Sequence, residues 1–283
     1  MGSDAVRREV ADALGEIDQI TRLGGGDINE AFGARLTDGR EIFLKTHPRP
    51  PATMYAREAT GLRWLAEPGA LRVPEVLYVS ERVLVLERIT PGRPAADTDE
   101  ALGRGLAALH RHGADGFGLT EDNFIGNLPQ DNGAEPDWPT FYARRRLEPQ
   151  LRMAADAGRA TSAMRRGFDA LFAKMDALVG PAEPPSRLHG DLWGGNWMVD
   201  ADGAPVLIDP AVYGGHREID LAMMRLFGGF SPRVFAAYAE AWPLAAGAAE
   251  RVDLYQLYPL MVHVNLFGGG YAASVERILA RLT

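Results

Sequence analysis

The chain has 283 residues, 46% of them hydrophobic and 24% charged, which is the composition of a globular protein large enough for one domain or two lobes. Its formal net charge is −8, which argues against nucleic acid or an anionic membrane as the main partner, because both favour clustered lysine and arginine. The absence of cysteine excludes disulfides, thiolate nucleophiles and cysteine-based zinc sites.

No targeting or anchoring segment is evident in the sequence. No apolar run approaches the roughly 20 residues that span a bilayer, and no basic region followed by an apolar stretch marks a signal peptide. The six histidines are scattered, without the HExxH spacing of a zinc protease. We therefore expect a cytoplasmic protein without nucleic-acid or membrane partners. Its oligomeric state is not encoded in any visible pattern, and a monomer is assumed.

The first third of the chain has the residue pattern of an antiparallel sheet. A short helical stripe around residues 6–14 comes first, and Asp38-Gly39 is a strong hairpin signal between two alternating segments. Residues 52–67 have helical spacing and stop before a Pro-Gly pair. The expected strands are 17–23, 29–36, 40–47, 73–80 and 82–89.

A cluster of turn residues at 90–94, TPGRP, is the expected domain boundary, because the sequence pattern becomes helical after it. The expected helices are 99–112, 140–151, 162–179 and a run from 218 to the C-terminus, with short strands near 197–199 and 206–208 and little periodicity over 113–139. We therefore predict an α+β, bilobal, protein-kinase-like fold. Residues 1–89 would form the nucleotide-binding lobe and residues 90–283 the catalytic and substrate-binding lobe, with a cleft near 87–92.

The triplet Gly24-Gly25-Gly26 lies between the first two predicted strands. Glycines at such a turn let the backbone approach a phosphate closely and offer it N–H groups. A glycine-rich hairpin turn without a ligand would contain the same residues, and the chain has no GxxxxGK[ST] motif of a Walker loop. The triplet alone is compatible with both interpretations.

Lys45 ends the third predicted strand, and Glu58 follows thirteen residues later on the predicted helix. Taken singly, each residue type at such a position is typical of the protein surface. In protein-kinase-like folds, however, a strand lysine pairs with a glutamate of the following helix and contacts the nucleotide phosphates. After a glycine-rich hairpin, the combination is compatible with two surface residues and with a Lys45–Glu58 ion pair, and the segment of residues 187–200 decides for the predicted ion pair.

The segment RLHGDLWGGNWMVD, residues 187–200, concentrates polar groups between apolar neighbours. Phosphoryl transfer to a hydroxyl needs a carboxylate for the proton and oxygen ligands for magnesium. Asp191 can supply the carboxylate, and Asn196 follows it with the H-x-D-x-x-x-x-N spacing of a kinase catalytic loop. Asp209 ends the next strand and would complete a pair of Mg²⁺ ligands with Asn196. His189 is expected to brace the loop through hydrogen bonds.

The motifs LHGDLWGGNWM and LIDPAVYGGHREIDLAM resemble those of the fructosamine kinase (ketosamine kinase) family, within the aminoglycoside-phosphotransferase-like kinases. The resemblance extends over nearly the whole chain and includes GGGDIN, FLK, REATGLRWL, DNFIGNLPQDN, DWPTFYARRRLEPQL and NLFGGGY. The HGD and Asn elements specify only the superfamily, whereas WGGN, DPAVYGGHRE and DNFIGNLPQ are narrower. The resemblance implies an enzyme that uses ATP and Mg²⁺ to phosphorylate a sugar hydroxyl of a ketosamine, a deglycation activity.

The same resemblance implies a role for each polar residue of these motifs. Asp191 would accept the hydroxyl proton, and Asn196 and Asp209 would bind the metal ion. Lys45 would contact the nucleotide phosphates, with Glu58 as its partner. Further nucleotide contacts would come from Gly24, Gly25 and Gly26 and from the backbone of Glu87, Arg88 and Ile89, which would bind adenine.

The resemblance also implies substrate and supporting residues. Trp193 follows the catalytic aspartate closely, so an aromatic face there could stack on the sugar, whereas Trp197 lies in a strand and is expected to pack in the core. His263 and Asn265 could line the substrate site or be buried polar groups of a helix. Asp220 is expected to support the catalytic loop rather than to touch substrate.

Three alternatives differ in function. Another small-molecule kinase of the superfamily, acting on an aminoglycoside, choline or homoserine, is compatible with the net charge of −8, although the narrower motifs favour a ketosamine. A protein kinase is disfavoured because HREIDLAM follows Asp209 too closely for an activation segment that ends in Ala-Pro-Glu. A nucleotide-binding module without catalysis is disfavoured because every catalytic element is present.

Overall fold

In the computed structural model of the chain, residues 4–24 and 29–283 are described. The chain forms two compact units, one made of Met1–Thr98 and Trp197–Pro210, the other of Asp99–Asn196 and Ala211–Thr283. The first unit is therefore built from two separate stretches of sequence. The predictions for Gly25 and Gly26 lie outside the described residues.

The first unit contains an antiparallel five-stranded sheet in the order β1-β2-β3-β5-β4, as the alternating segments predicted. A second small ladder joins β9 to β10. The elements of this unit are α1 (Asp4–Leu14), β1 (Ile17–Leu23), β2 (Glu30–Leu36), β3 (Glu41–Thr46), α2 (Met54–Ala66), β4 (Val76–Val79), β5 (Val83–Glu87), β9 (Trp197–Val199) and β10 (Pro205–Leu207).

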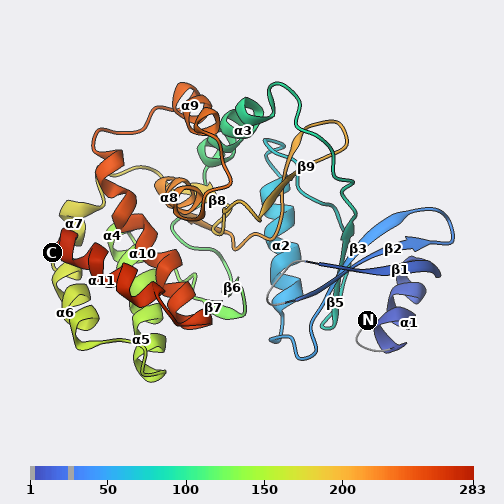
Figure 1. The fold of residues 1–283 in the computed structure, drawn as a ribbon, viewed down its shortest axis with the longest axis horizontal. Coiled ribbons are helices and arrows are strands. Elements are labelled where there is room, and N and C mark those ends of the chain that lie inside the picture. Colours follow the sequence, from blue (N-terminus) through green and yellow to red (C-terminus); the bar gives the residue numbers. More distant parts are fainter. Residues whose placement is uncertain (1–3, 25–28) are drawn as a thin grey trace. The chain divides into compact units, whose positions relative to one another are not determined.

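The two-residue period of the strands separates two small cores on opposite faces of this sheet. Ile42 and Leu44 of β3 pack in the core that α1 covers, together with Val85 of β5. Leu84 and Leu86 of β5 point the other way and pack against α2, and Phe43 of β3 joins them. Figure 1 shows α1 and α2 beside the sheet. The same alternation places the side chain of Lys45, also in β3, on the α2 side of the sheet.

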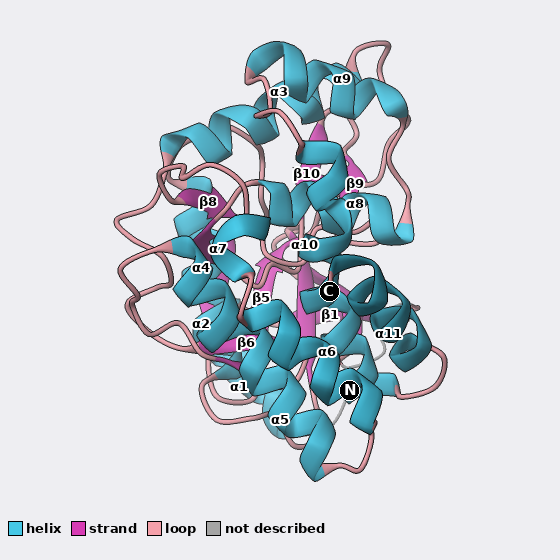
Figure 2. Cartoon of the chain, turned by 90° about the vertical axis from the view of Figure 1, so that its left-hand side faces the viewer, coloured by secondary structure: helices cyan, strands magenta, loops and turns pink. Residues whose placement is uncertain are grey.

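The second unit is mainly helical, as the sequence predicted for the C-terminal part. In Figure 2 the helices are cyan and the strands are magenta. Its largest core lies between α10, α11, α6, α8 and the helical segment 138–156. The helices are α3 (Thr98–His112), α4 (Trp138–Phe141), the π-helix η1 (Tyr142–Leu147), α5 (Glu148–Asp156), α6 (Ser162–Phe172), α7 (Met175–Leu178), α8 (Glu218–Phe227), α9 (Pro232–Ala241), α10 (Ala248–Phe267) and α11 (Tyr271–Leu282).

Two short ladders of this unit were not predicted from the sequence. The stretch 113–139 contains the hairpin β6 (Asn123–Ile125) and β7 (Leu128–Gln130), and β8 (Ser186–Leu188) pairs with β11 (Tyr213–Gly215). Strands of three residues are too short to show a two-residue period, and the β8–β11 pairing joins segments far apart in the chain. Within residues 4–24 and 29–283, no helix has the length and apolar character needed to cross a membrane.

Candidate active site

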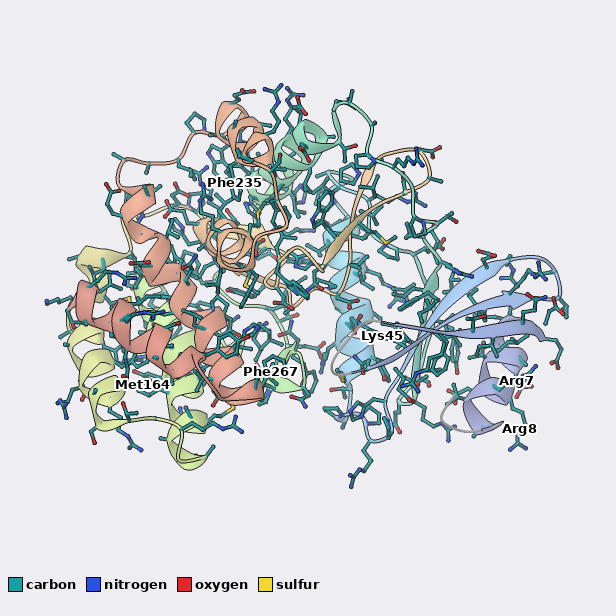
Figure 3. All side chains as sticks on the ribbon, in the orientation of Figure 1. Arg7, Arg8, Lys45, Met164, Phe235 and Phe267 are labelled. Carbon is teal, nitrogen blue, oxygen red and sulfur yellow. The ribbon has the colours of Figure 1, made fainter. Side chains whose placement is uncertain are left out.

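The first unit brings three charged side chains together on the α2 side of its sheet. The Nζ atom of Lys45, labelled in Figure 3, lies 2.6 Å from Oε1 of Glu58 on α2. It also lies 2.8 Å from Oδ1 of Asp209, two residues after the end of β10. The Lys45–Glu58 ion pair predicted from the sequence is thus confirmed, and Asp209 is a second partner 164 residues along the chain.

Burial and charge act in opposite directions on this group. Burial alone would lower the pKa of Lys45, but the carboxylates of Asp209 and Glu58 outweigh it and raise the pKa well above its ordinary value. Burial raises the pKa of Glu58, although Lys45 opposes that change. Two carboxylates share one ammonium, so the charged form of the lysine is stabilised twice, whereas the charged form of the mostly buried Glu58 is stabilised only in part. The lysine side chain is 8% exposed and that of Asp209 is 43% exposed, so Asp209 is the member that can reach a ligand.

The segment that follows the β9–β10 hairpin has an unusual backbone conformation at Asp209. Its φ angle is +53°, in the left-handed region, which aspartate tolerates better than most residues because its short side chain can hydrogen-bond locally. Gly92 donates its N–H to the carbonyl of Val199, and a Cβ on this glycine would lie 2.0 Å from the carbonyl oxygen of Asp200. The turn residues of 90–94 therefore let the chain pass directly against the hairpin.

In the second unit, Asp191 and Asn196 lie in one loop, as their spacing predicted. The side-chain nitrogen of Asn196 donates to the backbone carbonyl of Asp191 at 2.8 Å and to its Oδ2 at 3.0 Å. The loop starts with Gly190, whose φ is +83° and whose added Cβ would lie 2.0 Å from the carbonyl oxygen of Ala211. Only glycine fits between His189 and Asp191, which explains the middle residue of the HGD motif.

The carboxylate of Asp220, near the start of α8, binds the backbone of this loop. Its carboxylate accepts the backbone N–H of His189 at 2.8 Å and of Gly190 at 2.9 Å. It also lies 3.1 Å from Nε2 of His110, whose Nδ1 is 2.9 Å from the hydroxyl of Tyr238. Burial alone would raise the pKa of Asp220, but the hydrogen bond with His110 and the backbone N–H of Gly190 lower it. These contacts support the predicted role of Asp220 in positioning the loop.

Trp193 is one of the few large apolar side chains on the surface. It is 42% exposed, and its ring lies against Gly195, where an added Cβ would approach a ring carbon to 2.3 Å. Gly194 packs with its backbone against Gly229, after the end of α8. The two glycines of WGGN therefore have different functions: one gives room to the tryptophan ring and the other allows close contact with a neighbouring loop. Trp197 is half-buried in β9.

His263 and Asn265 lie near the end of α10. Nδ1 of His263 is 2.8 Å from the carbonyl oxygen of Pro259, and burial lowers the pKa of this histidine, so it is neutral at pH 7. Its ring is 4.5 Å from that of Phe227 and 5.4 Å from that of Phe267, measured between centroids. Phe227 and Phe267 are 37% and 50% exposed. His263 is therefore the centre of a partly exposed aromatic cluster.

Asn265 has a structural role on the same helix. Its side-chain nitrogen donates to the carbonyl oxygen of Gln150 at 2.9 Å and to the Oε1 atom of the same residue at 2.8 Å. Its Oδ1 atom is buried and has no hydrogen-bond partner among the described residues. These contacts tie α10 to α5, and they favour the interpretation of Asn265 as a buried helix residue over that of a substrate contact.

The predicted adenine-binding segment, residues 87–89, begins with the last residue of β5. Its first residue, Glu87, already donates its backbone N–H to the carbonyl of Glu75 at 2.8 Å. The guanidinium of Arg88 lies against Gly33 of β2, and Ile89 is buried. An adenine contact through the Glu87 N–H would thus require this bond to break. The adenine-binding role of the segment stays a prediction, as does that of Gly24, which is exposed.

The sequence motif DNFIGNLPQDN received no role from its residues, and the structure shows one. Asn123 donates to the carbonyl of Val212 at 2.8 Å, and Gln130 donates to Oδ1 of Asn123 at 2.8 Å. The hydroxyl of Tyr258 donates to Gln130 at 2.6 Å, and Asn132 accepts a bond from the fully buried Arg146. The amides of the β6–β7 hairpin thus form a buried network under the segment that precedes β11. Four amide residues in an irregular stretch, three of which join this network, were the only signal in the sequence.

The donor groups are chemically suited to magnesium. Among the described residues, no group of three or more His, Asp or Glu side chains could hold a metal ion by itself. Mg²⁺ binds proteins through one or two carboxylates and completes its coordination with phosphate oxygens and water. The nitrogen of Asn196 faces Asp191, so its amide oxygen is the atom that would contact a metal ion. Because Asn196 and Asp209 belong to different units, their joint metal site stays a prediction.

Comparison with known proteins gives the family. The sequence model for fructosamine kinase matches residues 3–283. A probable ketoamine kinase of Enterococcus faecium is 38% identical over 266 residues, covering 92% of this chain and 94% of that protein. The chloroplastic protein-ribulosamine 3-kinase of Arabidopsis thaliana is 36% identical over 297 residues, covering 99% of this chain and 87% of that protein.

Solved structures agree with the sequence matches. A fructosamine-3-kinase candidate from Thermobifida fusca has 40% identity and a TM-score of 0.90, with 99% of this chain and 100% of that chain covered. A choline kinase of Streptococcus pneumoniae, at 14% identity and a TM-score of 0.66 over 98% of this chain and 96% of that chain, shares the fold alone. The predicted protein-kinase-like α+β fold and the resemblance are both confirmed. The chain belongs to the fructosamine kinase family.

Proposed function

We propose that this protein is an ATP- and Mg²⁺-dependent kinase that phosphorylates a sugar hydroxyl of a ketosamine, of the fructosamine or ribulosamine type. The observation that carries the proposal is the loop of Asp191, whose carboxylate is fixed by Asn196 and whose backbone is fixed by Asp220. A carboxylate held in this way can orient a hydroxyl and accept its proton. The names of the relatives, ketoamine kinase and ribulosamine 3-kinase, support the substrate class.

Each residue has a definite part in the proposed reaction. The sugar hydroxyl oxygen forms a bond to the γ-phosphorus of ATP, the bond from that phosphorus to the β–γ bridging oxygen breaks, and ADP leaves. Asp191 accepts the hydroxyl proton. Lys45, oriented by Glu58, carries the positive charge that binds phosphate oxygens. Because the transition state of phosphoryl transfer is loose, positioning and charge contribute more than proton abstraction.

Magnesium would be held by Asp209 and Asn196. When bound, it neutralises charge on the β- and γ-phosphates of ATP. The exposed carboxylate of Asp209 supports this role, because its Oδ1 contacts Lys45 while the side chain remains 43% exposed. An aspartate and an asparagine are too few ligands to bind the ion tightly alone, so metal and nucleotide should bind together.

Substrate recognition is proposed for Trp193 and His263. Trp193 is an exposed ring two residues after the catalytic aspartate and can stack on a sugar face. His263 is neutral at pH 7 and surrounded by aromatic rings, so it would not repel the positively charged amine of a ketosamine. Both free and protein-bound ketosamines are candidates, and a relative is named for a protein-bound ribulosamine. A cytoplasmic location and a monomeric state belong to the same proposal.

The proposal is tested by acceptor competition. The purified protein is incubated with Mg·ATP and a panel of ketosamines of different sugar length, or with an aminoglycoside, choline or homoserine, and ADP formation is followed. We expect turnover with a ketosamine, loss of that turnover in Asp191→Asn, and a product whose phosphate position is located by NMR. Turnover of the aminoglycoside with none of any ketosamine would instead support the alternative substrate class.

A further inference from the structure

A single guanidinium in the first unit connects two carboxylates from distant parts of the chain. Arg72 lies in the loop between α2 and β4. Its Nη1 donates to Oδ2 of Asp200 at 2.5 Å, and its Nη2 donates to Oε1 of Glu87 at 2.5 Å. Asp200 starts the turn of the β9–β10 hairpin, and Glu87 ends β5. The catalytic roles assigned from the sequence do not include Arg72 or Asp200.

The backbone of Arg72 holds the same hairpin at a second point. Its carbonyl oxygen accepts the N–H of Leu207 at 2.9 Å, next to a parallel bridge with Val206. Leu207 is the last residue of β10, and Asp209 follows two residues later. The side chain of Arg72 therefore fixes the turn of the hairpin, while its backbone fixes the strand that leads to Asp209.

The side chain of Asp200 is buried and held by several hydrogen bonds. The Asp200 side chain is 5% exposed, and its Oδ1 atom accepts the N–H of Asp202 at 3.0 Å and of Ala204 at 2.9 Å. The hydroxyl of Thr98 donates to the carbonyl of Gly203 at 2.6 Å, which secures the turn further. A displacement of Asp200 would thus move the hairpin as a body.

The Glu87 side of the link reaches the segment proposed to bind adenine. Oε2 of Glu87 accepts the N–H of Glu75 at 3.3 Å, and its backbone pairs with Ile42 of β3. The Arg72 guanidinium therefore lies between the strand that leads into residues 87–89 and the hairpin that leads to Asp209.

We propose that Arg72 is a positioning residue for the nucleotide site, which sets the Asp209 carboxylate relative to Lys45 and to the segment after β5. This inference rests on the proposed function. Arg72 is 42% exposed and Glu87 34%, and an exposed ion pair such as this one contributes little to stability. Geometry is therefore the main consequence of the Arg72–Glu87 contact, whereas the pair with the 5% exposed Asp200 also anchors the hairpin. Arginine suits it because its planar fork presents separate N–H groups to two carboxylates, whereas a lysine ammonium is a single point.

The test compares Arg72→Met, Arg72→Lys and Asp200→Asn with Arg82→Met. Arg82 also pairs with a carboxylate in the first unit, Glu9, at 3.0 Å, and it is outside the proposed site. Binding of ADP is measured by calorimetry with and without Mg²⁺, and the melting temperature is recorded for each variant. The readout is the factor by which Mg²⁺ strengthens ADP binding, because this factor reports the position of Asp209 without requiring turnover.

Arg72→Met and Asp200→Asn should reduce that factor about tenfold, the usual effect of removing a residue that orients a metal ligand. Arg72→Lys should restore part of it, and Arg82→Met should not change it. A lower melting temperature of Arg72→Met with an unchanged factor would mean a purely structural role and overturn the inference. If Arg72→Met does not fold, Arg72→Lys and Glu87→Gln give the same comparison. Failure of the unaltered protein to bind ADP would refute the proposed function, whereas absence of ketosamine turnover with normal ADP binding would refute only the substrate.

Discussion

The two units hold their polar residues in different ways. In the first unit, Lys45, Glu58 and Asp209 hold one another through opposite charges, with little backbone involved. In the second, Asp191 is placed by neutral or backbone contacts: the amide of Asn196 and two N–H groups that Asp220 accepts. Substitutions in the first group should change charge balance, whereas substitutions of the residues that hold Asp191 should change geometry.

This difference follows from the chemistry proposed for each part. A lysine that binds phosphate must stay charged when it is buried, and nearby carboxylates achieve this. A carboxylate that orients a hydroxyl must keep its position, and hydrogen bonds from a tight loop fix that position without neutralising the carboxylate. The comparison therefore predicts separable effects on binding, turnover and stability.

The largest effect should come from Asp191→Asn. It keeps the shape of the loop but removes the proton acceptor, so kcat should fall roughly 10²- to 10⁴-fold. Binding of Mg·ATP should change little, because the phosphate-binding charges lie elsewhere. Equal losses in ATP affinity and in kcat, measured by calorimetry and steady-state kinetics, would contradict the separation of the two groups.

Asp209→Asn should come next. The substitution keeps a hydrogen-bond acceptor for Lys45 but removes the charge proposed to attract Mg²⁺, so kcat should fall roughly 100- to 1000-fold. Raising the magnesium concentration should recover part of the rate, and this titration is the measurement. Near-normal turnover at ordinary magnesium would show that Asp209 is not a metal ligand.

Lys45→Met tests the charge balance of the first unit. It leaves Glu58 buried beside Asp209 without a cation, and losing one partner of a buried ion pair typically costs about 3–5 kcal/mol in the free energy of unfolding. Urea unfolding measures this loss. The double variant Lys45→Met/Glu58→Gln should regain part of it, because the buried charge is gone. No recovery in the double variant would mean that Lys45 acts through packing alone.

The fourth prediction concerns the pH dependence of the second unit. Burial lowers the pKa of His216 from 6.5 to about 4. Between these values the unfolded chain binds a proton that the folded chain does not, so stability rises with pH, is complete above 6.5 and is lost as pH falls towards 4. The contribution is roughly 3 kcal/mol.

His216→Phe should therefore flatten the stability profile between pH 4 and 6.5, measured by urea unfolding at several pH values, because it keeps a ring against Tyr255 without a titrating group. His112 is exposed, and His112→Gln is the matched control, which should leave the slope of stability against pH unchanged. An unchanged slope in the buried variant would show that acid sensitivity arises elsewhere.

The smallest effect should come from Trp193→Ala, which removes a stacking surface available before the transition state. We expect a 3- to 10-fold increase, about 1 kcal/mol, in the KM for the sugar substrate, with kcat nearly constant. Gly195→Ala should act in the same direction, because its Cβ would displace the ring. Trp197→Phe is the control. A fall in kcat without a change in KM would place Trp193 outside substrate binding.

Much of the first unit could be predicted from the sequence, because its strands are long enough to show alternation and its hairpin turn is marked by Asp38-Gly39. The loop of Asp191 was also predictable, since all its residues lie within one short segment. The positions of Lys45 and Asp209 at strand ends predicted their roles, and the family motifs supported the same proposal. These are local patterns, and local physics determines them.

Contacts between distant segments were not predictable. The β9–β10 hairpin belongs to the first unit although it is far from the sheet in sequence, and Arg72 bonds to it across 128 residues. The amide network of Asn123 and Gln130 lies in a stretch without periodicity, and β8 and β11 have only three residues each. Nothing in a single polar residue tells which distant partner it will meet.

The sequence by itself thus determined the residue types of the site, the period of its strands and helices, and the family to which the chain belongs. Only the tertiary structure decided that Lys45 has two carboxylate partners, that Asp220 accepts two backbone N–H groups of the HGD loop, and that Arg72 joins a strand end to a hairpin. The reason is physical: periodicity and turns depend on neighbouring residues, whereas a buried charge finds its partner only when the chain has packed.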